Sequence, residues 1–187
     1  MESFVERIEE NPVIAAIRNE DDLSFALSSP VSTIFLLHAD IFNIGDMVQK
    51  IEANGQNVFV HMDFLEGIGK DKKAVEYIVK NIKPDGIIST RTNHIKYAKE
   101  MGIFTIQRFF MVDSLSYDTT IRTVKTIKPH MIEVMPAVIP RVIQRISTQL
   151  DIPIIGGGLI ANKEDIIEVL KHGAVGASTG KRELWSL

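Results

Sequence analysis

The most informative stretch of this sequence reads Ile154-Ile155-Gly156-Gly157-Gly158-Leu159-Ile160. One amphipathic segment later follows Gly173-Ala174-Val175-Gly176-Ala177-Ser178-Thr179-Gly180. Each is a short apolar run that ends in glycine or small polar residues, which is typical of a buried strand and the turn after it. Glycines let backbone N–H groups approach a phosphate closely, and Ser178 and Thr179 can add hydroxyl donors.

The spacing of these two segments suits one particular fold. They lie one strand–helix unit apart, and the last two strand ends of a (β/α)8 barrel commonly bind phosphate. Tight turns in a small barrel would also explain the glycines. The pattern favours a phosphate site, and its predicted residues are Gly156, Gly157, Gly158, Ser178, Thr179 and Gly180.

Short apolar runs recur along the whole chain and alternate with amphipathic segments. Most are nearly continuous in apolar residues, as expected for parallel strands covered by helices. The predicted strands are Val13–Ile17, Thr33–Leu37, Asn57–Met62, Gly86–Ser89, Phe104–Phe109, Met131–Met135, Pro153–Gly156 and Ala174–Ala177.

The segments between the strands carry helix-end signals. Asn162 is expected to cap the seventh helix and Gly173 to end it. Pro140 fits the first position of the sixth helix. Asp71 and Asn93 each precede an apolar stripe with helical spacing.

A closed ring of eight strand–helix units explains this pattern better than an open, doubly wound sheet. That sheet would need a glycine-rich turn after an early strand, and none is present. A faint repeat, Ile82–Ile88 against Ile127–Glu133, also suits a rotational fold, although Lys-Pro is a common helix stop. We therefore predict one α/β domain over residues 1–187, a small (β/α)8 TIM-type barrel. Because little chain remains, its last helix is truncated to about Glu183–Leu187.

Composition narrows the function classes. The 187 residues are 45% hydrophobic and 24% charged, contain no cysteine and carry a net charge of −3. Cysteine nucleophiles, disulfides and thiolate zinc sites are excluded. No signal peptide and no run near the ~18 apolar residues of a membrane span is found, so we expect a cytoplasmic protein with no membrane partner. A nucleic-acid role would need a local basic face or an oligomer.

Polar residues gather where the predicted strands end. His38 and Asp40 follow one strand, and His61 and Asp63 follow the next. These four residues could be metal ligands, contacts to ligand hydroxyls, or a structural polar layer. Ligand contact is the preferred interpretation, so we expect neither a metal nor a cofactor.

Glu133 lies late in the sixth predicted strand, among apolar residues. A buried carboxylate must be paired or bound to a ligand, and Arg91 or Arg108 could pair with it. With Arg18 at the end of the first strand, these residues complete the expected contacts to the non-phosphate part of the ligand. That set is Arg18, His61, Asp63, Arg91, Arg108 and Glu133.

Lysine placement argues against one enzyme class. A Schiff-base aldolase of this fold needs a lysine inside the barrel, and no predicted strand contains one. Basic surface is sparse: Arg141 and Arg145 are four residues apart on a helix, and Arg122 and Lys125 lie on the helix before it. These four residues could bind RNA phosphates, although on these residues alone an ordinary solvated surface is the preferred interpretation.

The chain resembles the glycerol-3-phosphate-responsive antiterminators of bacteria from end to end. The resemblance rests on Asn11–Arg18 (Asn-Pro-Val-Ile-Ala-Ala-Ile-Arg), Val60–Asp63 (Val-His-Met-Asp), Asp85–Arg91 (Asp-Gly-Ile-Ile-Ser-Thr-Arg), Gln107–Phe110 (Gln-Arg-Phe-Phe), Glu133–Pro136 (Glu-Val-Met-Pro) and Pro153–Ile160. It implies a regulator, not an enzyme, that binds glycerol 3-phosphate and the leader mRNA of glycerol-metabolism operons. It leaves open whether the chain forms a homo-oligomer.

An enzyme remains the competing hypothesis. A phosphosugar isomerase, aldolase or lyase of the ribulose-phosphate-binding type would use Asp63 and Glu133 as general acid and base. A metal-dependent phosphodiesterase would use His38, Asp40, His61 and Asp63 as ligands.

Overall fold

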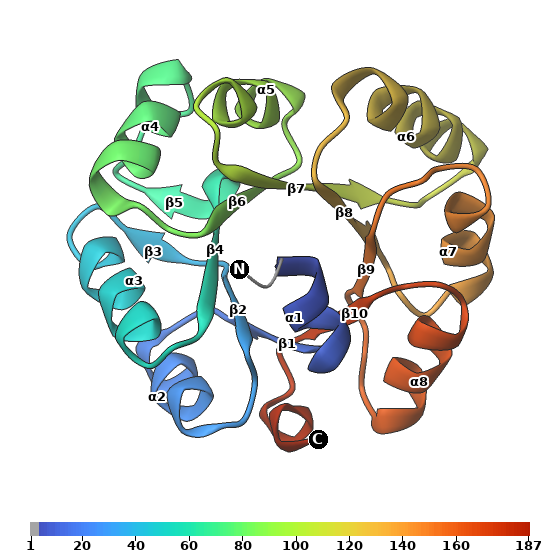
Figure 1. The fold of residues 1–187 in the computed structure, drawn as a ribbon, viewed down its shortest axis with the longest axis horizontal. Coiled ribbons are helices and arrows are strands. Elements are labelled where there is room, and N and C mark those ends of the chain that lie inside the picture. Colours follow the sequence, from blue (N-terminus) through green and yellow to red (C-terminus); the bar gives the residue numbers. More distant parts are fainter. Residues whose placement is uncertain (1–3) are drawn as a thin grey trace.

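In the computed structural model, which describes residues 4–187, parallel strands form a closed ring inside a layer of helices (Figure 1). The order around the ring is β1-β2-β4-β6-β7-β8-β9-β10, and β10 pairs with β1 to close it. Their bounds are Val13–Ile17, Thr33–Leu36, Asn57–His61, Gly86–Ser89, Phe104–Phe110, Met131–Met135, Ile154–Gly157 and Gly176–Thr179. The predicted (β/α)8 barrel is confirmed.

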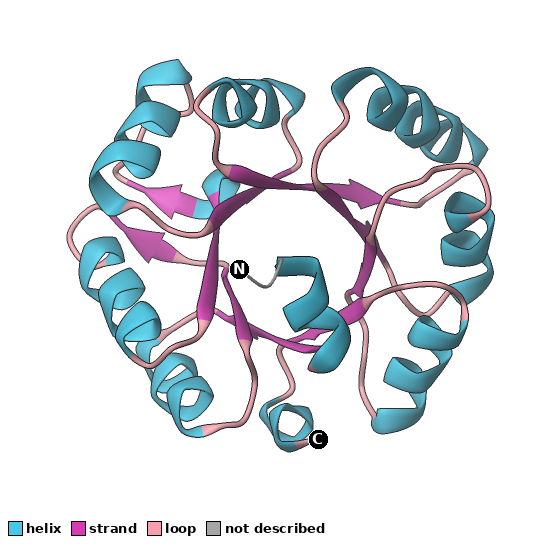
Figure 2. Ribbon diagram, viewed as in Figure 1, coloured by secondary structure: helices cyan, strands magenta, loops and turns pink. Residues whose placement is uncertain are grey.

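The helices lie outside the ring, except for α1 (Figure 2). They are α1 (Phe4–Glu10), α2 (Glu20–Ser28), α3 (Ile44–Ala53), α4 (Lys72–Tyr77), α5 (Thr92–Glu100), α6 (Ser114–Ile127), α7 (Pro140–Ser147) and α8 (Lys163–Lys171). A π-helical turn over Ile78–Ile82 continues α4. Two short strands, β3 (Ala39–Asp40) and β5 (Leu65–Glu66), pair with each other beside the barrel. No helix among residues 4–187 is long and apolar enough to cross a membrane.

Most predicted helix ends are confirmed. The side chain of Asn162 accepts the backbone N–H of Asp165 in a capping box, and the side chain of Asp71 accepts the backbone N–H of Ala74 at the start of α4. Pro140 is the first residue of α7, and Gly173 follows α8 with a φ of 97°. The expected cap at Asn93 is wrong, because α5 already begins at Thr92.

The last strand was predicted two residues too early. Ala174 still donates its backbone N–H to Val169 at the end of α8, so the strand starts only at Gly176. Ser178 and Thr179 therefore lie inside β10 rather than after it. The final helix, predicted over Glu183–Leu187, is a 3-10 helix over Arg182–Ser186.

The two Lys-Pro turns of the faint repeat share a left-handed lysine. Lys83 and Lys128 each end a helix in the left-handed conformation, with φ values of 58° and 50°. The backbone N–H of Lys83 bonds to Ile78, and that of Lys128 bonds to Val124. Lys83 therefore closes a π-helical turn and Lys128 an α-helical turn, so the two turns are similar but not identical.

The interior of the barrel is closed at its amino-terminal end. Inward side chains such as Phe35, Phe59 and Ile106 form one apolar cluster with Ile8 of α1. Figure 1 shows α1 lying across the opening of the ring. The sequence pattern did not predict this helix. Because α1 closes the amino-terminal end, the carboxyl ends of the strands form the accessible end of the barrel.

Candidate functional site

A pocket of about 650 Å³ opens at the carboxyl ends of the barrel strands. This volume is ample for a small phosphorylated metabolite. Seven of the predicted site residues line it: Arg18, Arg108, Glu133, Gly158, Ser178, Thr179 and Gly180. His38, another candidate for ligand contact, lines it as well. The other predicted residues do not, for reasons that follow from where each strand ends.

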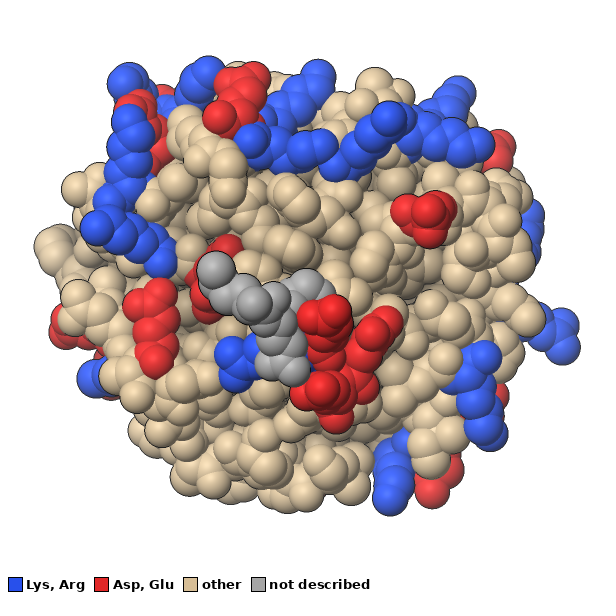
Figure 3. Space-filling view, in the orientation of Figure 1, with Lys and Arg blue, Asp and Glu red and all other residues tan. Residues whose placement is uncertain are grey.

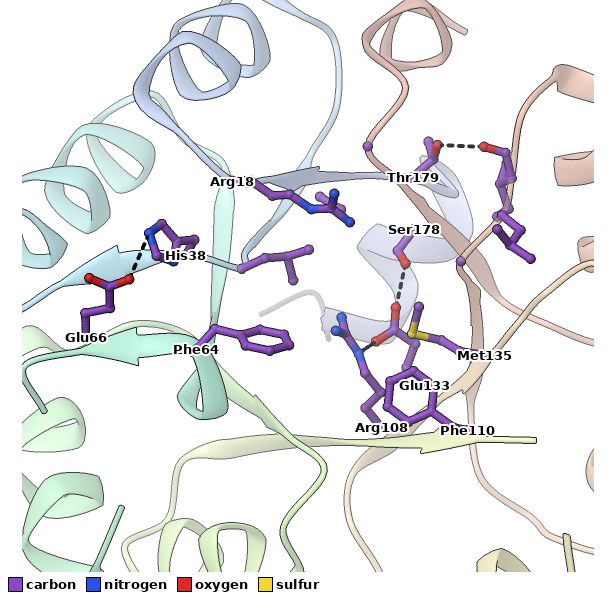
Figure 4. A pocket seen from close by; sticks show the side chains of 16 residues that line it. Arg18, His38, Phe64, Glu66, Arg108, Phe110, Glu133, Met135, Ser178 and Thr179 are labelled. Atoms are coloured by element: carbon purple, nitrogen blue, oxygen red, sulfur yellow. Dashed lines mark hydrogen bonds and ion pairs between the residues drawn. The ribbon is translucent and has the colours of Figure 1, made fainter. Parts of the chain in front are cut away.

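Glu133 lies at the bottom of the pocket between two donors (Figure 4). Arg108 Nε lies 2.5 Å from Glu133 Oε2, and Ser178 Oγ donates to Glu133 Oε1 at 2.5 Å. Glu133 is fully buried and Arg108 is only 5% exposed. Because β7 and β8 are neighbours and pair Arg108 with Glu133 in register, Arg108 rather than Arg91 compensates the carboxylate.

Gly157 provides the space for this arrangement. A Cβ atom there would lie 2.6 Å from Ser178 Oγ and would also collide with Glu133 Oε1. Gly156 faces the other way, where a Cβ would meet Val169 and lie 3.3 Å from Ile143. Both residues belong to β9 and neither lines the pocket. In the structure they allow close packing, rather than presenting backbone groups to the pocket as predicted.

The turn after β9 does line the pocket. Gly158 and Leu159 have φ values of 77° and 60°, and the left-handed conformation is uncommon for leucine. The backbone N–H groups of Gly158, Leu159 and Gly180 donate to no backbone carbonyl of residues 4–187 outside the strand ladders. Their N–H groups are thus the candidate backbone donors, and Leu159 is one that sequence reasoning missed.

Thr179 contributes differently from the prediction. Its hydroxyl donates to the carbonyl of Ile160 at 3.3 Å and accepts the backbone N–H of Lys181 at 3.1 Å. The side chain therefore joins the two loops that flank the pocket and is not a spare hydroxyl donor.

Arg18 points into the pocket from the end of β1 (Figure 4). Its backbone N–H donates to Asp22, whereas its guanidinium donates no hydrogen bond to any residue of the described chain. The Nη groups of Arg108 are likewise unbonded within residues 4–187. Two guanidinium groups therefore present donors to the same cavity.

Asp63 and Arg91 lie outside the pocket. β4 ends at His61, and a 3-10 turn over Met62–Phe64 rotates Asp63 away from the barrel axis. Asp63 accepts hydrogen bonds at 2.8 Å from the Ser89 hydroxyl and from both the N–H and the hydroxyl of Thr90. Arg91 Nε lies 3.7 Å from it. Both residues belong to a separate polar cluster behind the barrel wall.

The charge of Asp63 is set by this cluster. Burial alone would raise the pKa of Asp63, but hydrogen bonds from His94, Thr90 and Ser89 outweigh it and hold the pKa well below its usual value. A carboxylate so fully bonded to its own chain has little capacity left for a ligand.

His61 points inward but lies beneath the pocket. Its ring stacks on Phe64 with centroids 4.5 Å apart, and Phe64 rather than His61 lines the cavity. Nδ1 accepts the backbone N–H of Asp63 at 3.3 Å, whereas Nε2 is buried with no partner within the described chain. Burial and the nearby Arg108 guanidinium lower the pKa of His61 to about 3, so the ring is neutral.

His38 lines the pocket beside Glu66, whereas Asp40 does not line it. His38 Nε2 lies 3.6 Å from Glu66, and Asp40 accepts the backbone N–H groups of Phe42 and Asn43. Nowhere in residues 4–187 do three or more His, Cys, Asp or Glu side chains form a cluster that could hold a metal ion. The geometry thus separates the four residues of the metal hypothesis.

A sequence profile described as "Glycerol-3-phosphate responsive antiterminator" matches residues 13–185. The chain belongs to this family. The resemblance seen in the sequence is confirmed, and membership of an antiterminator family favours a regulator over an enzyme.

Relatives of this antiterminator-family chain support the same assignment. The glycerol uptake operon antiterminator regulatory protein from Listeria monocytogenes is 33% identical, with a TM-score of 0.90 over 93% of this chain and 94% of that one. A glycerol uptake operon antiterminator-related protein from Thermotoga maritima is 32% identical, with a TM-score of 0.84 over 94% and 98%. "Uncharacterized protein YgcP" from Escherichia coli is 33% identical over 96% of this chain and 94% of its own length.

The basic residues predicted to face RNA lie on the outer helices of this antiterminator-family barrel. Arg122 and Lys125 are exposed on α6, and Arg141 and Arg145 are exposed on α7. The Arg145 guanidinium lies 4.5 Å from the centre of the Tyr117 ring, which joins the two helices. None of the four lies near the pocket.

Proposed function

We propose that this protein is a transcription antitermination regulator that binds glycerol 3-phosphate in the pocket at the carboxyl end of the barrel. In response, it acts on the leader mRNA of glycerol-metabolism operons. The family supports the regulator, and the names of the Listeria and Thermotoga relatives support the link to glycerol uptake.

One observation carries the choice of ligand. The pocket is lined by two arginines, Arg18 and Arg108, and by two carboxylates, Glu133 and Glu66. Glu133 is buried and paired with Arg108, whereas Glu66 is exposed and lies 3.6 Å from His38. Within residues 4–187, the Arg18 guanidinium has no carboxylate partner, so it is available to bind a small anion. Arginine is well suited to phosphate, because its planar set of N–H donors can bind two oxygens at once.

The two ends of such a ligand have different partners. The phosphate is proposed to lie against Arg18 and the backbone N–H groups of Gly158, Leu159 and Gly180, at the usual phosphate position of the fold. The glycerol hydroxyls are proposed to reach the Glu133 carboxylate and the Nη groups of Arg108. A carboxylate accepts up to about four hydrogen bonds, and Glu133 uses two within the protein.

The competing enzyme hypothesis has less support. Asp63 lies outside the cavity that holds Glu133, so the two cannot act on one substrate as acid and base. None of the eight barrel strands contains a lysine for a Schiff base.

A pair of matched variants tests the ligand. Arg18→Met removes one guanidinium from the pocket, whereas Arg91→Met removes one from the cluster around Asp63. Losing a hydrogen bond to a charged group costs about 1.5–3 kcal/mol, so Arg18→Met should weaken glycerol 3-phosphate binding roughly tenfold to a hundredfold. Arg91→Met should bind as the parent does. Calorimetric titration measures both, and glycerol without phosphate should bind neither parent nor variants.

Two further measurements separate the regulator from an enzyme. Gel shifts with the leader RNA of a glycerol-metabolism operon should change on addition of glycerol 3-phosphate. The purified protein should not turn over glycerol 3-phosphate or common sugar phosphates, with or without divalent metal. Sustained turnover, or equal loss of affinity in Arg18→Met and Arg91→Met, would overturn the proposal.

A further inference from the structure

The face of the barrel that carries α1 has separated charges (Figure 3). Asp and Glu side chains lie around α1, while Lys and Arg side chains run along one edge over α5 and α6. We call the second group the basal band and define it as Lys96, Lys99, Arg122, Lys125 and Lys128. α5 and α6 run toward the amino-terminal ends of the strands that follow them, β7 and β8. The basal band therefore lies toward the end of the barrel opposite the pocket.

The cations of the basal band lack acidic partners. Elsewhere, exposed lysines form ion pairs, as Lys72 does with Glu100 and Lys171 with Glu168. Within residues 4–187, no carboxylate oxygen lies within 4.0 Å of any cation of the basal band. Like charges gathered on one surface repel one another, and this repulsion is relieved when a polyanion binds.

The band has an ordered centre. Lys99 Nζ donates to the carbonyl of Ile127 at 2.8 Å and also to that of Lys128. This contact joins α5 to the turn after α6, where Lys128 adopts its left-handed conformation. The ammonium of Lys99 thus holds Lys128 at a fixed place on the edge of the molecule.

A groove of about 350 Å³ lies beside this turn. Lys125 and Lys128 line it together with Pro129, Pro153 and His130, and Asp151 adds one carboxylate. Apolar lining residues such as Pro129 and Pro153 beside two ammonium groups suit a nucleotide, whose base can enter while its phosphates stay next to the lysines. Asp151 offers an acceptor to a base amino group or a ribose hydroxyl.

We infer that RNA binds across the basal band, with one nucleotide in the groove next to Lys125 and Lys128. The inference rests on the proposed function and names the surface that would bind RNA. This surface is α6 with its carboxyl-terminal turn, at the opposite end of the barrel from the proposed ligand. Of the residues first expected to contact RNA, Arg122 and Lys125 belong to the band, whereas Arg141 and Arg145 lie on α7 beyond it.

Three double variants test the surface with leader RNA as the probe. Lys125→Gln with Lys128→Gln should weaken RNA binding at least tenfold. It should also make the dependence of log K on log salt concentration shallower by roughly 1.4, for two lost contacts to a single strand. Arg141→Gln with Arg145→Gln tests α7. Lys50→Gln with Lys163→Gln removes two exposed lysines of α3 and α8 and should leave both quantities unchanged.

Each outcome decides between named alternatives. Parent-like RNA affinity and salt slope in the Lys125/Lys128 variant would overturn the inference, whether or not the α7 variant is impaired. A parent that binds glycerol 3-phosphate but no RNA would overturn the proposed function and this surface together. Competition by polyglutamate as strong as by RNA of equal charge would assign the band to an acidic protein instead. Unchanged glycerol 3-phosphate affinity in all variants checks that each is folded.

Discussion

The two ends of this barrel are built from the same strands, but the inward side chains are apolar at one end and polar at the other. Along β4, β7 and β8, the inward side chain changes from apolar to polar within two residues. The three pairs are Phe59 and His61, Ile106 and Arg108, and Met131 and Glu133. Because side chains alternate along a strand, a step of two residues stays inside the barrel and moves toward its carboxyl end.

The amino-terminal end is sealed by apolar packing. Phe59 contacts Phe4, Phe35 and Phe104 with ring centroids 5.6–5.9 Å apart, in mostly edge-to-face arrangements. Such packing excludes water and leaves no group for a ligand. At the other end, Arg108, Glu133 and Ser178 form a compensated polar chain beside an open pocket. The contrast indicates that one end supplies stability, and the other is the end where we propose that the ligand binds, as is usual for this fold.

The largest effect expected is at the polar end. Glu133→Ala leaves the Arg108 charge buried without its partner, which should reduce the free energy of unfolding by about 3–5 kcal/mol and abolish glycerol 3-phosphate binding. Chemical denaturation and calorimetric titration measure the two effects.

A double variant shows which effect comes from charge. Arg108→Met with Glu133→Met should recover much of the stability, because neither charge remains, but should not recover binding. Glu133→Ala with parent-like stability would mean that the pair is not compensated as the geometry indicates.

At the apolar end, loss of packing should act on stability alone. Phe59→Ala opens a cavity among the aromatic rings and should cost about 3–4 kcal/mol. The ligand affinity of the folded variant should stay within twofold of the parent, because the pocket is formed by other residues. A large loss of affinity measured by titration under native conditions would show that the two ends are coupled.

The smallest expected effect depends on pH and on His61. Its pKa is about 3 in the folded state and about 6.5 when unfolded, so the unfolded chain binds the extra proton between these values. Stability should therefore fall as the pH falls, by about 2 kcal/mol between pH 8 and pH 5.

Comparison with His61→Gln isolates this contribution. The variant should lose that part of the pH dependence, measured by denaturant titration at several pH values. Asp63 does not interfere, because its pKa is lowered: its contribution is present above the ordinary value near 4 and is lost only as the pH falls further. Identical slopes in parent and variant would show that His61 can be protonated in the folded protein.

The sequence by itself determined the barrel and showed that Glu133 needs a partner. Apolar runs and helix caps are local signals, so eight strands and ends such as those at Asn162 and Pro140 could be predicted from neighbouring residues. Glu133 was identified because a carboxylate inside an apolar strand needs a partner, and Arg91 or Arg108 could provide one. The register of β7 with β8 decided for Arg108.

Only the tertiary structure decided which residues around the pocket face it. The 3-10 turn after His61 directs Phe64 inward and Asp63 outward, and no local pattern reveals where a strand stops. Gly157 is needed for the space that Glu133 and Ser178 occupy, although these residues come from two other strands. An apolar run predicts a strand because neighbouring residues determine it. Whether a residue at the end of that strand faces the pocket depends on segments that are distant in the sequence and pack beside it.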